Sequence, residues 1–317
     1  MNLVVRKIVK NFGEKEVLKE ASFEAFSGKA LGLLGRNGAG KTTAIRTIMN
    51  VFPPDAGEIL LDGKVLRHTN ARIGYLPEEK GLYPKIKIRD QLIYLAELRG
   101  LDRQEAFAAV ARWLNRLEMS DMLNKKLETL SKGNQQKIQL AAALLNDPDI
   151  IILDEPFTGL DPVNAEMLKE IVREQVQAGK IVLFSSHQMN YVEEFCDDVA
   201  ILHGGVIVLA GDIRVIKRGY VRSRIAVTLG DRAASANLIR EKLEPAFQQK
   251  IIRAVKAIED DGCVVELFDA ADRDLLLRAL VTAGLSIEQF AVVEPTLEEI
   301  FIEKTRDDEP CDVGVVS

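Results

Sequence analysis

Residues 35–43 read GRNGAGKTT, and the apolar run LGLL at 31–34 stands directly before them. This stretch fits the pattern G-x-x-x-x-G-K-[ST], in which a glycine-rich turn leads from a strand into a helix. Glycines let the backbone curl tightly enough to point successive N–H groups at a phosphate, and the following helix presents its positive end. We expect Lys41 to meet the β- and γ-phosphates of a nucleoside triphosphate and Thr42 to meet a Mg²⁺ ion. The predicted phosphate-binding loop contains Gly35, Arg36, Asn37, Gly38, Ala39, Gly40, Lys41, Thr42 and Thr43.

A second motif, IIILDE at 150–155, places two carboxylates at the end of an apolar strand. Parallel sheets bind their ligands at the carboxyl ends of their strands. We expect Asp154 to hold Mg²⁺ through a water molecule. Glu155, its neighbour on the strand, is expected to point to the opposite side and to polarise the water that attacks the γ-phosphate. Beside a phosphate-binding loop the pair indicates ATP hydrolysis, whereas alone it would equally indicate two structural carboxylates that cap loops.

The composition is that of a folded protein of 317 residues, with 47% hydrophobic and 28% charged residues, and its length favours two domains. The net charge of −6 argues against a protein that coats nucleic acid. No apolar run approaches the roughly 18 residues needed to cross a bilayer. The start, MNLVVRKIVK, scatters basic residues where a signal peptide needs apolar continuity. We therefore expect a cytosolic chain with no membrane span and no nucleic-acid partner.

Strand and helix patterns alternate over about the first two hundred residues, which predicts a largely parallel sheet. Apolar strands at 150–153 and 180–185 enclose an amphipathic helix at 162–178. Asp161 as N-cap and Pro162 at the first helical position mark the start of that helix. Residues from about 86 to 147 hold helical patterns and no strand pattern, so we predict a helical subdomain within a first domain over residues 1–215.

The pattern changes after Gly219. Strands near 222–229, 251–258, 263–268 and 286–293 and helices at 233–243 and 271–283 follow one another in the order βαββαβ. With Asp260-Asp261-Gly262 as a hairpin turn, this order predicts a small α+β, ferredoxin-like domain over 220–305. A last helix is expected to begin at the capping box Thr296-Leu-Glu-Glu299. Residues 306–317 are predicted to form a disordered tail.

A third stretch, LSKGNQQK at 130–137, stands at the start of a predicted helix. Ser131 and the first helical N–H groups together form an end that can bind an anion. A serine followed by a glycine at a helix start is also an ordinary cap, so this stretch alone leaves both interpretations open.

Together these motifs resemble the ATP-binding cassette of ABC transporters, in the family's order and over about residues 3–210. In the family's terms residues 35–43 are the Walker A motif, 130–137 the signature, and the strand running into Asp154-Glu-Pro156 the Walker B motif. The D-loop falls at Gly159-Leu-Asp161 and the switch histidine at His187. The resemblance implies an α/β fold of the P-loop NTPase class, with a RecA-like mixed sheet core and the helical subdomain.

The resemblance also assigns roles to single residues. Phe12 takes the place of the aromatic residue that stacks on adenine. His187 takes that of the γ-phosphate sensor, and it forms the catalytic set with Glu155 and Lys41. Glu78 stands where the family usually has the glutamine of the Q-loop. Its carboxylate can still ligate Mg²⁺, but it adds negative charge beside the phosphates.

The signature implies contacts with a nucleotide held by a second cassette. In the family this surface contacts ATP across a dimer, which here assigns Ser131 and Gly133, and Asp161 of the D-loop belongs to the same nucleotide-binding set. Lys132 and Asn134 depart from the usual LSGGQ. Lys132 either offsets the added negative charge or faces solvent.

The implied function is that of the ATP-hydrolysing subunit of a membrane ABC transporter, with ATP and Mg²⁺ as cofactors. One copy of each motif implies a second cassette, identical or paralogous, as a partner. A separate integral membrane permease is also implied; it would dock beside Glu78, near Leu82 and Tyr83, and hold the chain at the inner face of the cell membrane. The segment LPEEKGLYP at 76–84 and the added C-terminal domain resemble the NatA-type sodium-extrusion and ABC-2 export subgroup.

Two other functions compete with this interpretation. A soluble ABC ATPase of translation or DNA repair usually fuses two cassettes or inserts a coiled-coil arm, whereas this sequence has one cassette and no sustained heptads. A non-hydrolysing module that binds ATP to gate a partner is suggested by the departures at 78, 132 and 134. The presence of Glu155 and His187 weighs against it.

Overall fold

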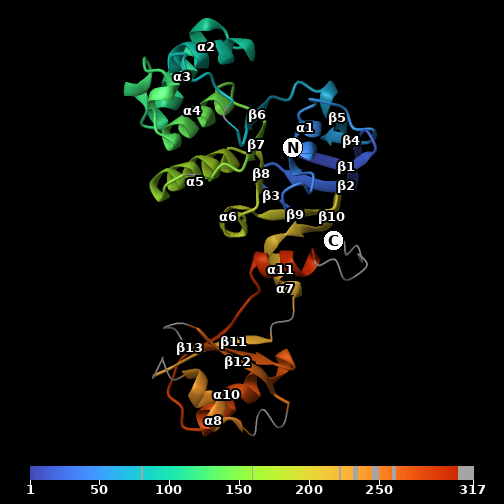
Figure 1. Cartoon of the computed structure of the whole chain (residues 1–317), viewed down its shortest axis with the longest axis vertical. Coiled ribbons are helices and arrows are strands. Elements are labelled where there is room, and N and C mark those ends of the chain that lie inside the picture. Colours follow the sequence, from blue (N-terminus) through green and yellow to red (C-terminus); the bar gives the residue numbers. More distant parts are fainter. Residues whose placement is uncertain are drawn as a thin grey trace. The chain divides into compact units, whose positions relative to one another are not determined.

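The structure, a computed structural model, describes residues 1–79, 81–158, 160–220, 223–230, 235–244, 250–258 and 262–305. The chain divides into two compact units (Figure 1). One contains Met1–Ile213 and the described residues from Phe301 onward, and the other contains Arg214–Ile300. The domain limits expected at 215, 220 and 305 stay predictions, and the predicted tail at 306–317 lies outside the described residues.

A six-stranded sheet forms the centre of the first unit, in the order β10-β9-β3-β8-β7-β6. Its strands are β3 (Ala30–Leu34), β6 (Ile73–Leu76), β7 (Ile150–Asp154), β8 (Ile181–Ser186), β9 (Asp198–His203) and β10 (Val206–Asp212). β6, β7, β8, β3 and β9 pair in parallel, and β10 pairs antiparallel with β9. Every residue of β3, β7 and β8 is buried, as their unbroken apolar runs predict for a covered parallel sheet. Their carboxyl ends therefore meet at one edge, where the predicted site residues follow.

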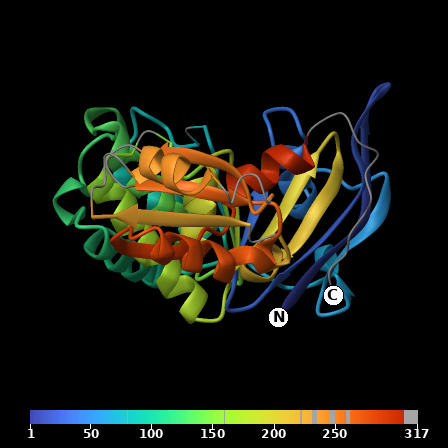
Figure 2. The ribbon, with the colours of Figure 1, turned by 90° about the horizontal axis from the view of Figure 1, so that it is seen from below.

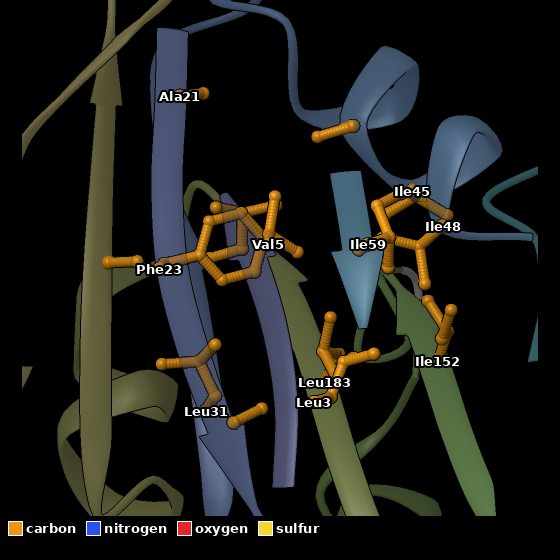
Figure 3. Close-up of a cluster of buried hydrophobic side chains, with 14 of the residues drawn as sticks. Leu3, Val5, Ala21, Phe23, Leu31, Ile45, Ile48, Ile59, Ile152 and Leu183 are labelled. Atoms are coloured by element: carbon orange, nitrogen blue, oxygen red, sulfur yellow. The ribbon is translucent and has the colours of Figure 1, made fainter. Parts of the chain in front are cut away.

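A second, antiparallel sheet has the order β2-β1-β4-β5. It contains β1 (Asn2–Phe12), β2 (Lys15–Phe26), β4 (Ala56–Leu61) and β5 (Lys64–Val65), with a short 3-10 turn, η1 (Leu66–His68), after it. Between the two sheets a buried apolar cluster joins Val5 and Phe23 to Ile48 of α1 (Lys41–Ile48) and Leu183 of β8 (Figure 3). This packing holds α1, and with it the 35–43 loop, against both sheets.

The predicted helical subdomain consists of α2 (Ile88–Leu98), α3 (Arg103–Arg116) and α4 (Lys132–Leu144), with two short turns, η2 (Ser120–Met122) and η3 (Leu127–Thr129). α3 begins at a capping box that the sequence analysis missed: the Glu105 N–H donates to Asp102 at 2.8 Å, and the Asp102 N–H donates to Glu105 at 2.9 Å. Trp113 Nε1 donates to the Leu144 carbonyl at 3.0 Å and joins α3 to α4. Figures 1 and 2 place these helices and the antiparallel sheet on opposite sides of the six-stranded sheet.

Three more helices follow strands of the central sheet. α5 (Pro162–Gln177) begins as predicted, since Asp161 accepts from the Asn164 N–H at 2.9 Å and proline occupies the first turn. α6 (Met189–Phe195) follows β8. α7 (Ile213–Gly219) comes after β10. The last helix, α11 (Leu297–Lys304), begins at the predicted Thr296 capping box. The Glu299 N–H donates to Thr296 Oγ1 at 3.2 Å, which confirms this prediction.

The second unit has the predicted βαββαβ order: β11 (Arg224–Leu229), α8 (Ser235–Lys242), β12 (Ile252–Ile258), β13 (Gly262–Leu267), α10 (Arg273–Thr282) after the short turn η4 (Ala270–Asp272), and β14 (Ile287–Val292). The sheet order is β12-β13-β11-β14, all antiparallel, which is the ferredoxin-like arrangement. Ile239 of α8 and Leu276 of α10 pack with Ile225 and Val265 of the sheet in one apolar cluster. The predicted turn residues Asp260 and Asp261 lie outside the described residues.

Candidate functional site

The 35–43 loop joins β3 to α1 at the carboxyl edge of the central sheet. Gly38 and Gly40 have φ angles of 81° and 112°, in the region that favours glycine. A Cβ on Gly35 would lie 2.6 Å from the Leu202 carbonyl oxygen, so the loop also needs glycine for space. Lys41 is buried, and its Nζ donates to the Gly35 carbonyl at 2.7 Å. The ammonium group is thus held across the loop that would cradle a phosphate.

Asp154 ends β7 and is buried. It accepts a hydrogen bond from Ser185 Oγ on one oxygen and from the Tyr75 hydroxyl, at 3.3 Å, on the other. Burial and the negative charge of Asp154 raise the pKa of Tyr75 to about 12, so Tyr75 stays a neutral donor. The sequence analysis missed Tyr75 and Ser185. The available signal was a hydroxyl near the end of each apolar strand that flanks β7.

Glu155 is not on the strand, which corrects the expected reason for its orientation. β7 ends at Asp154, and Glu155 has a φ angle of 48°. This left-handed turn, rather than strand alternation, separates the two carboxylates. Glu155 Oε2 accepts from Ser186 Oγ at 3.1 Å, and Oε1 lies 2.7 Å from His187 Nδ1. Glu155 is 6% exposed, while the His187 side chain is 50% exposed, so the pair has a buried carboxylate and a solvent-facing imidazole.

Phe12 ends β1 and is 50% exposed. Its ring meets Phe52 edge-on, with centroids 5.4 Å apart. Phe12 pairs with Lys15 on β2, and two residues further along β2 the Val17 carbonyl oxygen would lie 3.1 Å from a Cβ on Gly40. The hairpin that carries the exposed ring therefore abuts the 35–43 loop.

Glu78 is exposed and follows β6 by two residues. Its charge adds to the rise of the Tyr75 pKa, whereas the charge of Arg46 on α1 lowers it. The charges of both side chains therefore act on Tyr75, the donor to Asp154. The role of Glu78 toward Mg²⁺ and the nucleotide stays a prediction.

A separate cluster lies at the starts of α4 and α5. Ser131 Oγ accepts from the Asn134 N–H at 3.3 Å as the N-cap of α4. A Cβ on Gly133 would lie 2.8 Å from Asn164 Nδ2, which in turn donates to Asp161 at 2.6 Å. Hydrogen bonds from Asn164 hold the pKa of Asp161 below its ordinary value. Asn164 was missed by the sequence analysis; an asparagine three residues after a capping aspartate was the available signal.

This second cluster does not join the 35–43 loop within the chain. In Figure 1, α4 lies on the opposite side of β6–β8 from α1. Lys132 is exposed, in line with the solvent-facing alternative. Gly159 of the predicted D-loop lies outside the described residues.

The helical subdomain touches the carboxylate turn through α4. Gln136 Nε2 donates to the Pro156 carbonyl, and Gln139 Nε2 donates to the Glu79 carbonyl at 3.5 Å. Beyond these contacts the subdomain exposes Tyr83, Ile86, Tyr94 and Leu98, with exposed fractions of 66%, 42%, 61% and 68%. Leu82 is only 8% exposed, whereas its neighbour Tyr83 faces solvent. Docking of a partner near these two residues stays a prediction.

A Mg²⁺ ion bound with a nucleotide would find oxygen donors here. Each oxygen of Asp154 accepts one hydrogen bond from the protein, which leaves lone pairs for a metal-bound water. The Thr42 hydroxyl makes no hydrogen bond within the described part of the chain. The described residues hold no group of three or more His, Cys, Asp or Glu that could bind a metal. Mg²⁺ usually takes one or two protein ligands plus phosphates, so this sparse donor set fits.

Comparisons with known families agree with this geometry. The ABC transporter family matches residues 18–158, and the ATP-binding protein DrrA1-3-like, C-terminal domain family matches residues 211–305. No helix among the described residues has the length and apolar character to cross a membrane.

Curated relatives carry related names. An uncharacterized ABC transporter ATP-binding protein YhaQ of Bacillus subtilis is 40% identical over 95% of this chain and 98% of its own length. ABC transporter ATP-binding protein NatA of the same organism is 37% identical over 65% of this chain and 83% of its own length. Nod factor export ATP-binding protein I of Burkholderia lata is 36% identical over 65% of this chain and 69% of its own length.

A solved ATP-binding subunit of an ABC transporter is 31% identical, with a TM-score of 0.64, and the match covers 69% of this chain and 92% of that one. The predicted resemblance and the predicted fold class are both confirmed by these matches. The chain belongs to the family of ABC transporter ATP-binding proteins.

Proposed function

We propose that this chain is the ATP-hydrolysing subunit of an ABC-2 type exporter, in which ATP closes two cassettes and a separate integral membrane permease carries the cargo. The observation that carries the proposal is the contact of 2.7 Å between buried Glu155 and His187, at the same sheet edge as the 35–43 loop. A carboxylate held in this way suits a general base for water.

Nucleotide binding would begin at the 35–43 loop. The loop N–H groups and the N-terminus of α1 offer an anion site, and Lys41 would exchange its bond with the Gly35 carbonyl for one with phosphate. The exposed ring of Phe12 offers a π-face for the adenine base. Thr42 and Asp154, with Glu78 nearby, would hold Mg²⁺, which when bound neutralises phosphate charge.

Hydrolysis would rest on Glu155 and its two partners. The Ser186 hydroxyl occupies one carboxylate oxygen at 3.1 Å and His187 the other at 2.7 Å, which limits the rotation of the carboxylate. Glu155 would orient the attacking water and take its proton. His187, half exposed, would lie between this carboxylate and the γ-phosphate. This constellation supports an ATPase over a non-hydrolysing gate.

Closure would need a second cassette. The Ser131, Gly133 and Asp161 cluster and the 35–43 loop lie on different sides of β6–β8, so one chain cannot apply both to the same nucleotide (Figure 1). A partner cassette, identical or paralogous, would supply the missing half. ATP would then favour the closed pair because it makes contacts across the interface that the open state lacks.

Attachment to a membrane would come through the permease. Tyr83, Tyr94 and Leu98 expose apolar surface on the helical subdomain, which favours burial by a partner. Such docking would hold the chain at the inner face of the cell membrane. Export is supported by the name of the Nod factor export relative and by the DrrA-like match at the C-terminal end.

The test is to tag the chain, purify it from detergent-solubilised membranes of its own host, and identify the proteins recovered in stoichiometric amount. We expect an integral membrane protein, and an MgATPase activity that Glu155→Gln abolishes. Recovery with ribosomes or nucleic acid instead, or activity that survives Glu155→Gln, would contradict the proposal.

A further inference from the structure

Four aromatic side chains gather behind the Glu155 and His187 pair. The ring of Phe157 stacks on Tyr191, with centroids 4.4 Å apart and planes at 20°. It also stacks on Phe195 at 5.4 Å and 28°, and it meets Phe184 at 5.4 Å and 48°. Phe157 and Phe184 are 6% and 2% exposed, whereas Tyr191 and Phe195 are half-buried, so the inner half of the cluster is shielded from water. Offset-stacked rings prefer defined separations and angles, which makes such a cluster stiffer than an aliphatic one.

The four rings come from the segments that carry the catalytic groups. Phe157 follows Glu155 by two residues, and Phe184 on β8 precedes Ser186, the hydroxyl partner of Glu155. Tyr191 is the third residue of α6, four positions after His187. The cluster therefore ties the turn after β7 to the end of β8 and to the start of α6.

One local hydrogen bond restrains the turn at His187: the Gln188 N–H donates to Ser186 Oγ at 3.0 Å. The helix that follows adds little further restraint of its own. His187 stands between β8 and α6, a helix of only seven residues whose N-cap, Gln188, makes no side-chain capping bond. Helices this short are unstable without tertiary packing. Where α6 sits, and with it the preceding histidine, must therefore be set by what the helix packs against.

Contacts with β3 and α5 also hold α6 in place. Val192 packs under β3 so closely that a Cβ on Gly32 would lie 2.3 Å from its Cγ1. Lys169 of α5 donates to Glu194 at 2.9 Å, and its ammonium lies 5.6 Å from the Tyr191 ring centroid and 5.2 Å from that of Phe195. These contacts hold the helix against α5 and β3, whereas the Phe157 ring joins it to the Glu155 segment through Tyr191 and Phe195.

We infer that the stacked pair of Phe157 and Tyr191 positions His187 against Glu155, so that the two rings set the distance between the general base and the imidazole. The inference rests on the proposed function, because it assigns a positioning role for the same reaction. We assign neither ring a contact with substrate. Loss of the stack is expected to lower kcat through His187 and to leave the KM for ATP nearly unchanged, because the 35–43 loop is built from other elements.

The first measurement compares Tyr191→Ala with Tyr191→Phe. We expect Tyr191→Ala to lower kcat by about 10- to 100-fold, the range that a misplaced catalytic group produces. Tyr191→Phe keeps the ring and should retain the activity. Leu168→Ala, at a buried position of α5, is the control for general loss of packing and should leave kcat unchanged. Equal kcat in Tyr191→Ala and the parent would overturn the inference.

The second measurement follows His187 directly. The chain has three histidines, so imidazole ¹⁵N spectra are simple, and His187→Ala assigns the signal. Glu155→Gln should shift the Nδ1 resonance, because it replaces the carboxylate acceptor. We expect Tyr191→Ala to move the same resonance in the same direction and Tyr191→Phe to leave it in place. A lowered kcat with an unmoved Nδ1 signal would show a merely structural role for the stack.

Failure of the proposed function would look different. If Glu155→Gln and His187→Ala leave the ATPase activity intact, the proposed chemistry is wrong, whatever the stack does. If both abolish activity while Tyr191→Ala has neither effect, only the positioning role is wrong.

Discussion

Lys41 holds a buried ammonium over the loop that it would share with phosphate. Its hydrogen bond of 2.7 Å to the Gly35 carbonyl keeps the charge at the mouth of the loop. Hydrogen bonds to charged groups contribute about 1.5–3 kcal/mol. We therefore expect Lys41→Ala to weaken ATP binding by roughly 10- to 150-fold. Titration with a fluorescent ATP analogue measures the change, with the exposed Lys85→Ala as control. Unchanged affinity would remove Lys41 from the site.

Tyr75 is a neutral donor to the carboxylate expected at the metal. Tyr75→Phe deletes the hydroxyl that bonds Asp154 at 3.3 Å and little else. We expect a higher Mg²⁺ concentration for half-maximal nucleotide binding and unchanged binding without Mg²⁺, since only the metal side loses its support. A change that is equal with and without Mg²⁺ would instead indicate a general distortion.

The same hydroxyl gives a pH prediction. The pKa of Tyr75 is raised from 10.0 to about 12, so the folded state holds this proton more tightly than the unfolded state. The resulting stabilisation is complete below pH 10 and is lost as the pH rises toward 12. The melting temperatures of the parent and of Tyr75→Phe, measured between pH 10 and pH 12, should therefore converge near pH 12. A constant difference between the two melting temperatures over this pH range would show that the ionisation of Tyr75 is not linked to folding.

At the scale of elements, the second residue of α4 is a glycine, Gly133, where a helix would prefer alanine. Gly→Ala inside a helix stabilises it by up to about 1 kcal/mol. Here a Cβ on Gly133 would lie 2.8 Å from Asn164 Nδ2, and two hydrogen bonds to Asp161 restrain Asn164. We expect Gly133→Ala to lower the melting temperature and Asn164→Ala to recover part of the loss in the double variant. A higher melting temperature for Gly133→Ala would contradict this prediction, because it would show that the Asn164 side chain can move away without loss of stability.

In the second unit, β11 and α11 are joined by an ion pair. Arg224 meets both oxygens of Glu299, one of them at 2.6 Å, and this hydrogen bonding lowers the pKa of Glu299 from 4.5 to about 2. The stabilisation is present above pH 4.5 and is lost as the pH falls toward 2. Glu299→Gln should therefore be less stable than the parent near neutrality and should converge with it in acid, while its neighbour Glu298→Gln should follow the parent throughout. Because Arg224 and Glu299 are both partly exposed to solvent, we expect the difference in stability to be small.

The features that could be predicted from the sequence are those whose residues lie close together along the chain. The 35–43 loop, the Asp161 cap and the Thr296 capping box are complete within a few residues, and all three form as predicted. Tyr75 and Ser185 flank Asp154 only because three strands far apart in the chain align in parallel register. Asn164 likewise meets Gly133 only because α4 and α5, which are separate in the sequence, pack together. The left-handed turn at Glu155 has no glycine or asparagine at that position to indicate it. Contacts that depend on register or on packing between elements could not be derived from one sequence.

At the scale of the whole molecule, one chain carries the 35–43 loop and the Ser131 cluster on different sides of β6–β8, and we propose that these are two half-sites of a nucleotide site. This arrangement predicts that nucleotide governs association. Glu155→Gln keeps the shape of the side chain, and an amide accepts no proton from water, so bound ATP should persist and hold the pair closed. We expect the variant to elute as a dimer from a sizing column in MgATP and as a monomer without nucleotide, and Ser131→Arg in the same background to stay monomeric because it blocks the signature surface. A monomeric Glu155→Gln chain in saturating MgATP would mean that the two half-sites do not meet across a dimer.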